Sequence, residues 1–540
     1  MTATSDTQSE ILIYNGSIHT LEDESPAASV MAVRGRELVY VGHDRQKAAG
    51  LLGGRAEKID LEGQTVVPGL IEGHAHFFSE GQRLREIDLH NMSKEQVLET
   101  IRQEALKRPE GQWIRGYGWN QEQWPGQRWP GKSELDAVAP NHIVALDRTD
   151  KHSIWANSRV FEAAGISEDT PDPVGGEFLR DEHGRLQGMI IGWAMAPVWE
   201  AFPPVSDHDH YLNAMKAQEE YFGFGITSLM DAGTMMRDLE VMKKAFQSGD
   251  LKLRVRAMML AGEKQDEAYF DSGGELVRDL YDERLSIVGT KIHSDGSLGS
   301  RSAWMLADYA DRPGHRGSHN FTDEELAVVM ERARDHNFQV SIHAIGDAAV
   351  SQSVAVMKKV LNRRPMDHRW RIEHYQVVTK ESMAEALKLG LIFSIQTIGI
   401  MTDLDMAEDR LGPERIKRAY TWREILDGGG KIVNGSDGPV ESVNPFQGMY
   451  AAVTRATLLG RPQGGWYPEH RLTRLEALKT YTTWSAYSEF NENRKGSLAA
   501  GKLADFAVLD RDPLTCPIEE LPEARALMTF SGGEKVHDAR

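Results

Sequence analysis

The sequence contains one cysteine, Cys516. A single cysteine cannot form an intrachain disulfide, and it excludes a zinc site built from several thiolates. Basic residues are also few relative to acidic ones: 62 lysines and arginines against 81 aspartates and glutamates leave a net charge of −19. Sequence-independent binding of nucleic acid needs a basic surface, so we expect no nucleic-acid partner. The acidic balance favours solubility.

Long apolar runs are also missing. No uninterrupted apolar stretch approaches the roughly 18–20 residues that a membrane helix needs, so we expect no membrane span. Residues 1–6 show neither the basic nor the apolar region of a secretory signal, and we therefore expect a cytoplasmic protein. The hydrophobic content of 40% is enough for a large buried core and argues against disorder.

Among the features that are present, His74-Ala75-His76 is the most informative. It follows an apolar run at residues 65–71 that is typical of a buried strand. Side chains two apart on a strand point the same way, so two imidazoles at a strand end can hold one metal ion. The pattern also occurs by chance on exposed strands. The motif alone leaves a metal site and a plain surface pair open.

Short strand patterns occur at both ends of the chain. Residues 11–14, 30–33 and 38–41 alternate with glycine-containing turns, and a similar segment returns at residues 501–509. This arrangement predicts one composite β-sandwich domain, formed by residues 1–64 and 492–540.

Eight strand candidates lie between these ends. They are residues 65–71, 226–231, 253–261, 287–293, 339–343, 370–374, 391–395 and 431–434. Helical patterns fill most later intervals, and the clearest covers residues 323–336 after a capping box at residues 322–325. This α/β alternation predicts a distorted (β/α)8 TIM barrel over residues 65–491, with its active site at the carboxyl ends of the strands.

The interval between the first two candidate strands is too long for a structureless loop. We expect an inserted subdomain at about residues 80–220, lying over the barrel mouth. Its segment 113–130 is rich in tryptophan. A compact aromatic core is the favoured interpretation, and the lining of a substrate cavity by one or two rings is the alternative.

Polar side chains occur at the predicted carboxyl ends of five strands. These candidates are His74, His76, Lys291, His343, His374 and Asp437. Each one has an ordinary alternative, because most of the 19 histidines must be surface or core residues and a lysine can simply pair with an acid. Their common occurrence at strand ends, in this order, predicts a single site. His293 follows Lys291 by two residues and is expected to be a neighbour of the site rather than a ligand.

Four segments carry a resemblance to a known family. They are residues 67–76 (VPGLIEGHAH), 113–119 (WIRGYGW), 291–299 (KIHSDGSLG) and 496–505. Over nearly its whole length the chain resembles the amidohydrolase superfamily of metal-dependent hydrolases. Within it, the chain is similar to the YtcJ-like (amidohydrolase 3) branch and to enzymes of the N-substituted formamide deformylase type. The chain departs from the branch pattern at Asn120 and at Asp150-Lys151-His152, both in the insertion that would shape the substrate pocket.

The resemblance implies a metal centre, with zinc as the default and manganese, cobalt or iron as alternatives. His74, His76 and Asp437 would hold one ion, and His343 and His374 a second. Lys291 would bridge them after carboxylation of its ε-nitrogen, because an ammonium beside two dications would be repelled whereas a carbamate is an anionic oxygen ligand.

The resemblance also implies the chemistry. Metal-bound water would attack a small-molecule amide of the N-acyl or N-substituted formamide kind, with Asp437 as general base and then general acid. Candidate substrate contacts are His152, Trp119, Asp295 and Arg301. A homodimer is the commonest assembly of soluble enzymes and is expected here.

Three other functions stay open. A mononuclear deaminase of a heterocycle would need no bridging lysine. An ester or carbamate hydrolase could use the same centre. A binding or regulatory protein could retain the barrel without catalysis.

Overall fold

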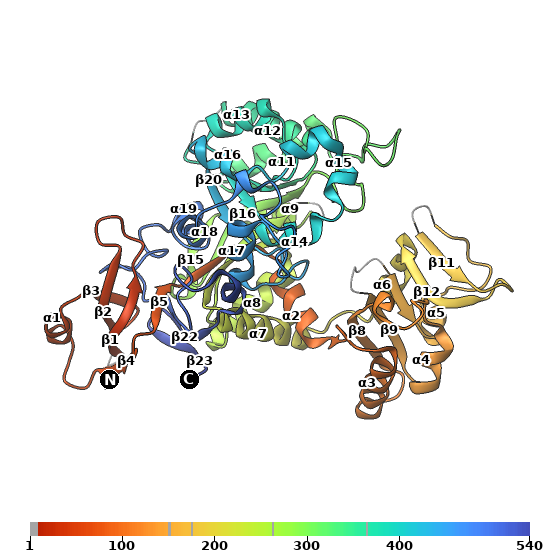
Figure 1. The fold of residues 1–540 in the computed structure, drawn as a ribbon, viewed down its shortest axis with the longest axis horizontal. Coiled ribbons are helices and arrows are strands. Elements are labelled where there is room, and N and C mark those ends of the chain that lie inside the picture. Colours follow the sequence, from red (N-terminus) through yellow and green to blue (C-terminus); the bar gives the residue numbers. More distant parts are fainter. Residues whose placement is uncertain (1–8, 149–152, 174–175, 262–263, 363–365) are drawn as a thin grey trace. The chain divides into compact units, whose positions relative to one another are not determined.

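The computed structural model describes residues 9–148, 153–173, 176–261, 264–362 and 366–540 (Figure 1). The chain divides into two compact units. One comprises Met1–Gly81 and Ala214–Arg540, and the other comprises Gln82–Asn213. Helices α2 (Phe77–Arg85) and α7 (Asp207–Gly223) span the two points of division. No helix in the described ranges has both the length and the apolar character needed to cross a membrane.

The larger unit contains the predicted barrel. Eight parallel strands pair in the order β6 (Leu70–Ala75), β13 (Ile226–Thr234), β14 (Arg254–Leu260), β16 (Leu285–His293), β17 (Gln339–Ala344), β18 (Arg371–His374), β19 (Ile392–Ile395) and β20 (Lys431–Asn434). The circle nearly closes between β20 and β6. A Cβ added at Gly73 would lie 2.3 Å from Val433 and 2.5 Å from the Asn434 carbonyl oxygen, so only glycine permits this approach. The predicted fold class is confirmed.

The first predicted strand, residues 65–71, is wrong as a single barrel strand. Its first half, β5 (Thr65–Pro68), pairs with β1 (Glu10–His19) and β21 (Phe506–Leu509) in another sheet, and the barrel strand β6 begins only at Leu70. The break falls at Pro68-Gly69, because proline has no N–H to continue a ladder. The N–H of Gly69 donates to the Asp505 carbonyl, whereas the next N–H donates to Gly225.

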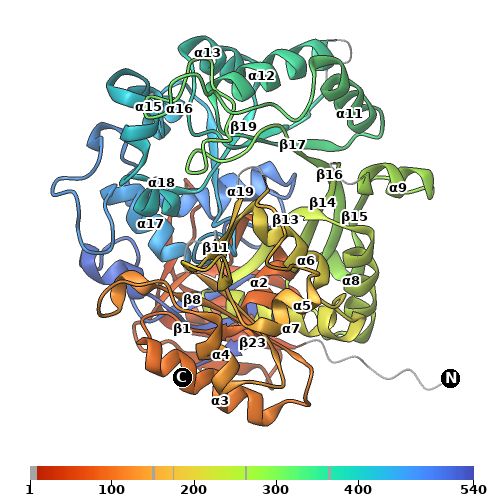
Figure 2. The same cartoon turned by 90° about the vertical axis from the view of Figure 1, so that its right-hand side faces the viewer.

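Helices cover the outside of the barrel (Figure 2). They include α8 (Met236–Ser248), α9 (Gln265–Asp271), α11 (Asp323–Asp335), α12 (Asp347–Asn362), α13 (Lys380–Leu389), α16 (Trp422–Asp427), α17 (Pro445–Thr454), α18 (Arg474–Thr480) and α19 (Thr483–Ser488). The predicted helix at residues 323–336 is α11. Its capping box is formed by Thr322 and Glu325, and it buries Leu326, Met330 and Ala333 toward the barrel.

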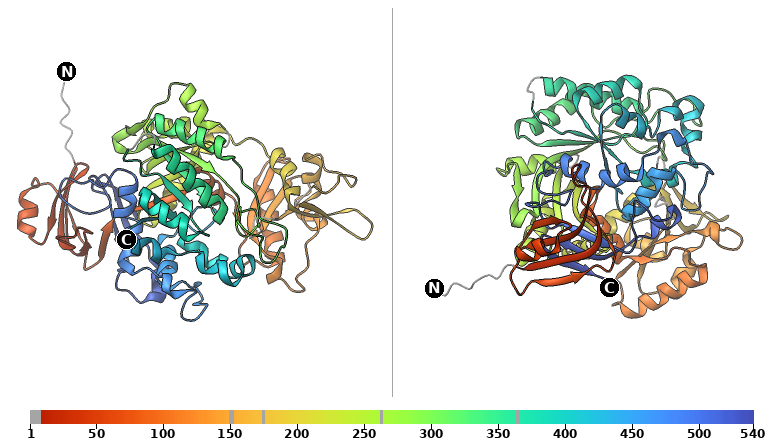
Figure 3. Two further views of the ribbon diagram at one scale, coloured as in Figure 1. Left: turned by 90° about the horizontal axis from the view of Figure 1, so that it is seen from above. Right: turned by 60° about the vertical axis from the view of Figure 1, so that its left-hand side comes forward.

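Both ends of the chain build one further sheet in the same unit, as Figure 3 shows by the red and blue strands that adjoin. The order is β23 (Glu534–Asp538), β22 (Ala526–Ser531), β21 (Phe506–Leu509), β5, β1 (Glu10–His19), β2 (Ala27–Arg34) and β3 (Glu37–Gly42), with β4 (Glu57–Asp60) on β1. Its core contains Ile13, Met31, Val66 and Phe506. A buried bidentate ion pair joins this sheet to the barrel. It links Arg254 of β14 to Asp505, with distances of 2.6 and 2.9 Å.

The smaller unit is a six-stranded sheet with helices. Its strand order is β11 (Gly176–Arg180), β12 (Leu186–Gly192), β10 (Ser153–Ala156), β9 (Ile143–Arg148), β8 (Trp113–Trp119) and β7 (Ile87–Asp88), and its helices include α3 (Lys94–Lys107), α4 (Lys132–Val138), α5 (Ser158–Ala163) and α6 (Ala196–Ala201). Trp119 stacks on Trp124 at 5.5 Å and packs edge-on against Trp155 at 5.8 Å. The aromatic segment therefore forms a packed core.

Candidate metal centre

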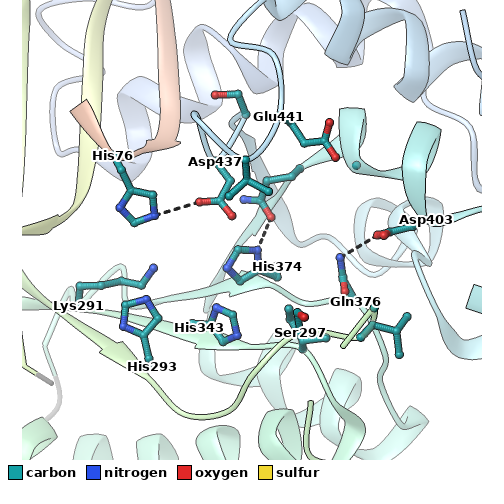
Figure 4. Close-up of a pocket in the computed structure, with 17 residues that line it drawn as sticks. His76, Lys291, His293, Ser297, His343, His374, Gln376, Asp403, Asp437 and Glu441 are labelled. Atoms are coloured by element: carbon teal, nitrogen blue, oxygen red, sulfur yellow. Dashed lines mark hydrogen bonds and ion pairs between the residues drawn. The ribbon is translucent and has the colours of Figure 1, made fainter. Parts of the chain in front are cut away.

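The carboxyl ends of the barrel strands surround a cavity of about 350 Å³. Five of the six predicted ligands line it: His76, Lys291, His343, His374 and Asp437 (Figure 4). The sixth, His74, is fully buried, and its Nε2 lies 3.4 Å from Nζ of Lys291. The structure thus brings together side chains that lie more than 300 residues apart in the sequence, because each follows or ends a strand of one nearly closed barrel.

Three of these residues have the geometry of a cation site. One ligand atom each from His74, His374 and Asp437 lies within 4.8 Å of the others. Oδ1 of Asp437 is 3.1 Å from Nε2 of His76 and 3.3 Å from Nε2 of His74. It is buried and has no hydrogen-bond partner in the part of the chain that the structure describes. A divalent ion would satisfy this oxygen and the surrounding imidazole nitrogens together, so the residues present fit a metal.

His74 is oriented by a buried carboxylate on the opposite side of the barrel. Its Nδ1 donates to Oε2 of Glu373 at 2.5 Å. Oε1 of Glu373 accepts from Ser341 and Arg371, at 2.7 and 2.5 Å. Burial by itself would raise the pKa of Glu373, but Arg371 and His74 hold it well below its usual range. Since an ionised carboxylate can only accept, Nδ1 carries the proton and the Nε2 lone pair faces the cavity side.

Two more histidines are held in the same manner. Nδ1 of His374 donates to Oε1 of Gln396 at 2.7 Å, which leaves its Nε2 free to bind. Nε2 of His343 lies 3.2 Å from the Gly296 carbonyl oxygen, so this nitrogen carries the proton and Nδ1 keeps the lone pair. The rings of His343 and His374 are 4.4 Å apart. Fixed tautomers with inward lone pairs are what metal-binding histidines require.

Lys291 is the only lysine or arginine among the described residues that line the cavity. It is almost completely buried on β16. Burial lowers its pKa, although Glu373 and Asp437 oppose the shift. Loss of its proton makes the nitrogen nucleophilic, which is the state that carbon dioxide modifies.

The backbone that carries the candidate ligands is strained. His374 and Asp437 have φ values of 69° and 59°, in the left-handed region that non-glycine residues rarely occupy. Glu72 stabilises this backbone, because one of its oxygens accepts from the N–H groups of His74 and Ser436 at 3.0 and 2.9 Å. Burial raises the pKa of Glu72 to about 8. Strain that neighbouring contacts hold in place is common at functional sites.

Among the predicted substrate contacts that the structure describes, Trp119, Asp295 and Arg301 do not line the cavity. Trp119 is fully buried in the core of the smaller unit, which favours the interpretation of this segment as a packed core; its contact with substrate stays a prediction. The carboxylate of Asp295 accepts hydrogen bonds from the backbone N–H groups of Trp304, Ile345 and Gly346. Arg301 pairs with Asp311 and does not line the cavity. His152 lies outside the described residues. His293 does line the cavity, beside Lys291.

Sequence reasoning missed several residues of the site. Glu72, Glu373 and Gln396 are absent from the site that the sequence predicts. Buried acids inside apolar strands are the one signal available for Glu72 and Glu373, and both are completely inaccessible.

Comparisons with known proteins agree with this geometry. Residues 57–537 match the model of the amidohydrolase family Amidohydro_3. The chain therefore belongs to the amidohydrolase family, which makes it a metal-dependent hydrolase that acts on carbon–nitrogen bonds.

Individual relatives cover nearly all of the chain. The Bacillus subtilis protein YtcJ is 29% identical, over 97% of this chain and 99% of its own length. The N-substituted formamide deformylase of Arthrobacter pascens is 27% identical, over 97% of each. The crystal structure of an uncharacterized metal-dependent hydrolase from Pyrococcus furiosus superposes with a TM-score of 0.77 and 27% identity, over 94% of this chain and all of the other. The predicted branch is confirmed.

Proposed function

We propose that this protein hydrolyses the amide bond of an N-acyl amine or an N-substituted formamide at the centre described above. The ligands would be His74, His76, Lys291, His343, His374 and Asp437, holding two zinc ions, or manganese, cobalt or iron in their place. The observation that supports this most directly is the buried Oδ1 of Asp437, which makes no hydrogen bond among the described residues and lies 3.1 and 3.3 Å from Nε2 of His76 and His74. The outer nitrogens of His74 and His374 are already bonded. A deformylase of N-substituted formamides that is similar over nearly the whole chain supports the substrate class.

The ligand arrangement divides the work between residues. When bound, divalent ions polarise an amide carbonyl and lower the pKa of water toward neutrality. Asp437 lies where it can accept a proton from the attacking water and return it to the leaving nitrogen. Burial opposes ionisation of Asp437, but His74 and His76 hold its pKa well below the usual range, so it is ionised, as a metal ligand must be. Lys291, as its carbamate, would bridge the two ions.

Deamination at a single metal ion is the nearest alternative. Such enzymes need a carboxylate that is free to move protons, and Glu373 is the acid closest to this role. Both of its oxygens are bonded, to His74, Ser341 and Arg371, and it is completely buried. It is therefore an anchor for His74, which favours amide hydrolysis. Ester or carbamate hydrolysis at the same centre stays a second outcome of the test.

The test combines metal analysis with turnover. We expect two ions per chain, hydrolysis of a panel of formamides and N-acyl amines, loss of turnover on chelation, and recovery on addition of zinc. One ion per chain, with ammonia released from a heterocycle, would favour deamination. Hydrolysis that resists chelation contradicts the mechanism, and a metal-loaded protein that turns over no amide supports a binding role. The homodimer and the cytoplasmic location stay predictions.

A further inference from the structure

The cavity has a second wall, in which Gln396 already bonds to the candidate ligand His374. Four polar side chains form it: Gln376, Gln396, Asp403 and Glu441. Gln376 and Gln396 follow strands β18 and β19, Asp403 ends α14 (Ile400–Asp403), and Glu441 follows β20. In the view of Figure 4, Asp403 and Gln376 lie on the opposite side of His374 from Lys291 and His293. We call Gln376, Asp403 and Glu441 the acceptor wall.

The two carboxyl groups of the acceptor wall have no cationic partner. Neither Asp403 nor Glu441 forms an ion pair with any residue that the structure describes. Asp403 accepts from Tyr420 and Gln376, at 2.8 and 3.2 Å. Glu441 accepts a hydrogen bond from Thr402 at 2.8 Å. Thr402 directly precedes Asp403 in the sequence, so one segment contacts Glu441 and carries Asp403. Two half-buried acids in one cavity without a countercharge carry a desolvation cost, and such groups are common at functional sites.

The electrostatics agree with the geometry. Burial raises the pKa of Asp403 to about 6 and that of Glu441 to about 7, and repulsion from Asp403 and Asp437 adds to the shift of Glu441. A cation placed between Asp403 and Glu441 would offset this cost, since an opposite charge favours the ionised form.

A third acceptor points to a ligand independently of the acids. Oε1 of Gln376 is buried and has no hydrogen-bond partner among the described residues. Its amide nitrogen is turned to Asp403 (Figure 4), so the oxygen is left for another donor. An ammonium group offers three N–H donors and no acceptor. The wall provides one amide oxygen and two carboxylates.

We propose that the acceptor wall binds a cationic nitrogen at the end of the substrate remote from the amide that is cleaved. The substrate class is then a mono-N-acylated or N-formylated diamine, with a protonated amine or guanidinium at its free end. Leu298, Ile345 and Val440 line the same cavity and suit an aliphatic linker. This inference rests on the proposed amide hydrolysis for the reaction, but the binding of a cation can be tested without it.

The kinetic test uses pairs of formamides that differ only at the free end. A series of mono-N-formyl diaminoalkanes is compared with N-formyl alkylamines in which a methyl group replaces the ammonium. Hydrogen bonds to charged groups predict a kcat/KM ratio of roughly 10–100 in favour of the ammonium at the best chain length. In Asp403→Asn/Glu441→Gln the ratio should fall to about one. The single variants should each lose part of it.

A matched control and a binding assay complete the design. Glu414→Gln changes an exposed acid that pairs with Lys417 on the surface, and the ratio should stay that of the wild type. Calorimetry on the metal-loaded protein compares butylguanidinium with neutral butylurea. Butylguanidinium stays protonated and cannot bind a metal ion. Thermal unfolding checks that each variant is folded.

The outcomes separate this inference from the proposed function. Equal hydrolysis of both formamides by the wild type would overturn the cation site and leave amide hydrolysis standing. If neither formamide is hydrolysed, binding of butylguanidinium that the double variant loses would support the cation site alone. Binding that is absent, or the same in both proteins, would overturn it. A ratio that the double variant retains would assign the preference to other residues.

Discussion

Replacing Glu373 by glutamine tests whether a buried carboxylate sets the metal affinity through His74. Glutamine keeps the size and can still accept from Arg371, but it carries no charge. Its amide can also donate to Nδ1 of His74, which would place the imidazole proton on Nε2, the nitrogen that faces Asp437 and Lys291. We expect metal affinity to fall by about 10- to 100-fold, the usual effect of losing such a partner.

The effect on folding should be smaller than the effect on metal binding. Removing one partner of a buried ion pair costs about 3–5 kcal/mol when the other charge is stranded. Here Arg371 also donates to the Gly73 carbonyl and to Ser394, at 2.6 and 2.7 Å, so it stays partly satisfied. We therefore expect Glu373→Gln to lower unfolding free energy by less than this range and Glu373→Ala to approach it.

The assay is competition with a chromophoric chelator at constant pH, with unfolding of the metal-free proteins measured in parallel. Glu414→Gln serves as the control, because it removes an exposed charge and should change neither quantity. If a folded Glu373→Gln variant binds metal as tightly as the wild type, Glu373 does not set the metal affinity. His74 would then not be a ligand, or it would need no fixed tautomer.

Four further changes have defined outcomes. Lys291→Ala should lose metal and activity, with partial recovery on adding short carboxylic acids; normal content of two ions, measured by mass spectrometry, would remove Lys291 from the site. Asp437→Asn should retain at least one ion while kcat falls by about 10²–10⁴, and a near-normal kcat would assign the proton transfer to another group. Trp119→Ala should cost about 3–5 kcal/mol in unfolding free energy without changing kcat/KM ratios between substrates, and changed ratios in folded protein would support its predicted substrate role. Asp403 has a folded pKa of about 6 against 3.8, so the native state binds the extra proton; wild-type stability should fall relative to Asp403→Asn as pH rises through this window, and parallel stability curves would contradict the assignment.

The sequence predicted the barrel well because each strand is a short, largely apolar run, and five of the eight carry polar residues at their predicted carboxyl ends. The exception is the run at residues 65–71, which is apolar throughout but changes sheets in the middle. Its hydrophobicity reports burial, and both halves are buried. Only Pro68-Gly69 marks the change, since proline ends one ladder and glycine allows the backbone to approach Thr227.

The candidate ligands could be predicted because the parallel topology puts strand ends together. The residues that orient them could not be predicted, since their partners come from distant strands. Glu373 and His74 are 299 positions apart and meet only when the barrel nearly closes. Asp295 is the opposite case, a residue that the sequence proposed for the site but that has a structural contact instead. A polar residue just after a strand suggested a substrate contact, yet backbone N–H groups of a neighbouring loop occupy its carboxylate.

The two walls of the cavity differ in how firmly the fold holds them. The outer nitrogens of His74, His343 and His374 bond to groups from other strands or the loops that follow them, so a change in one ligand would disturb several strands of the barrel. Asp403 and Glu441 are held by loop and helix residues, including Tyr420 and Thr402, and neither acid contacts a barrel strand through a hydrogen bond that the structure shows. Substitution at the acceptor wall can therefore change the substrate while the metal ligands keep their geometry. This separation explains why membership of the family establishes the kind of reaction and leaves the substrate to be read from the loops.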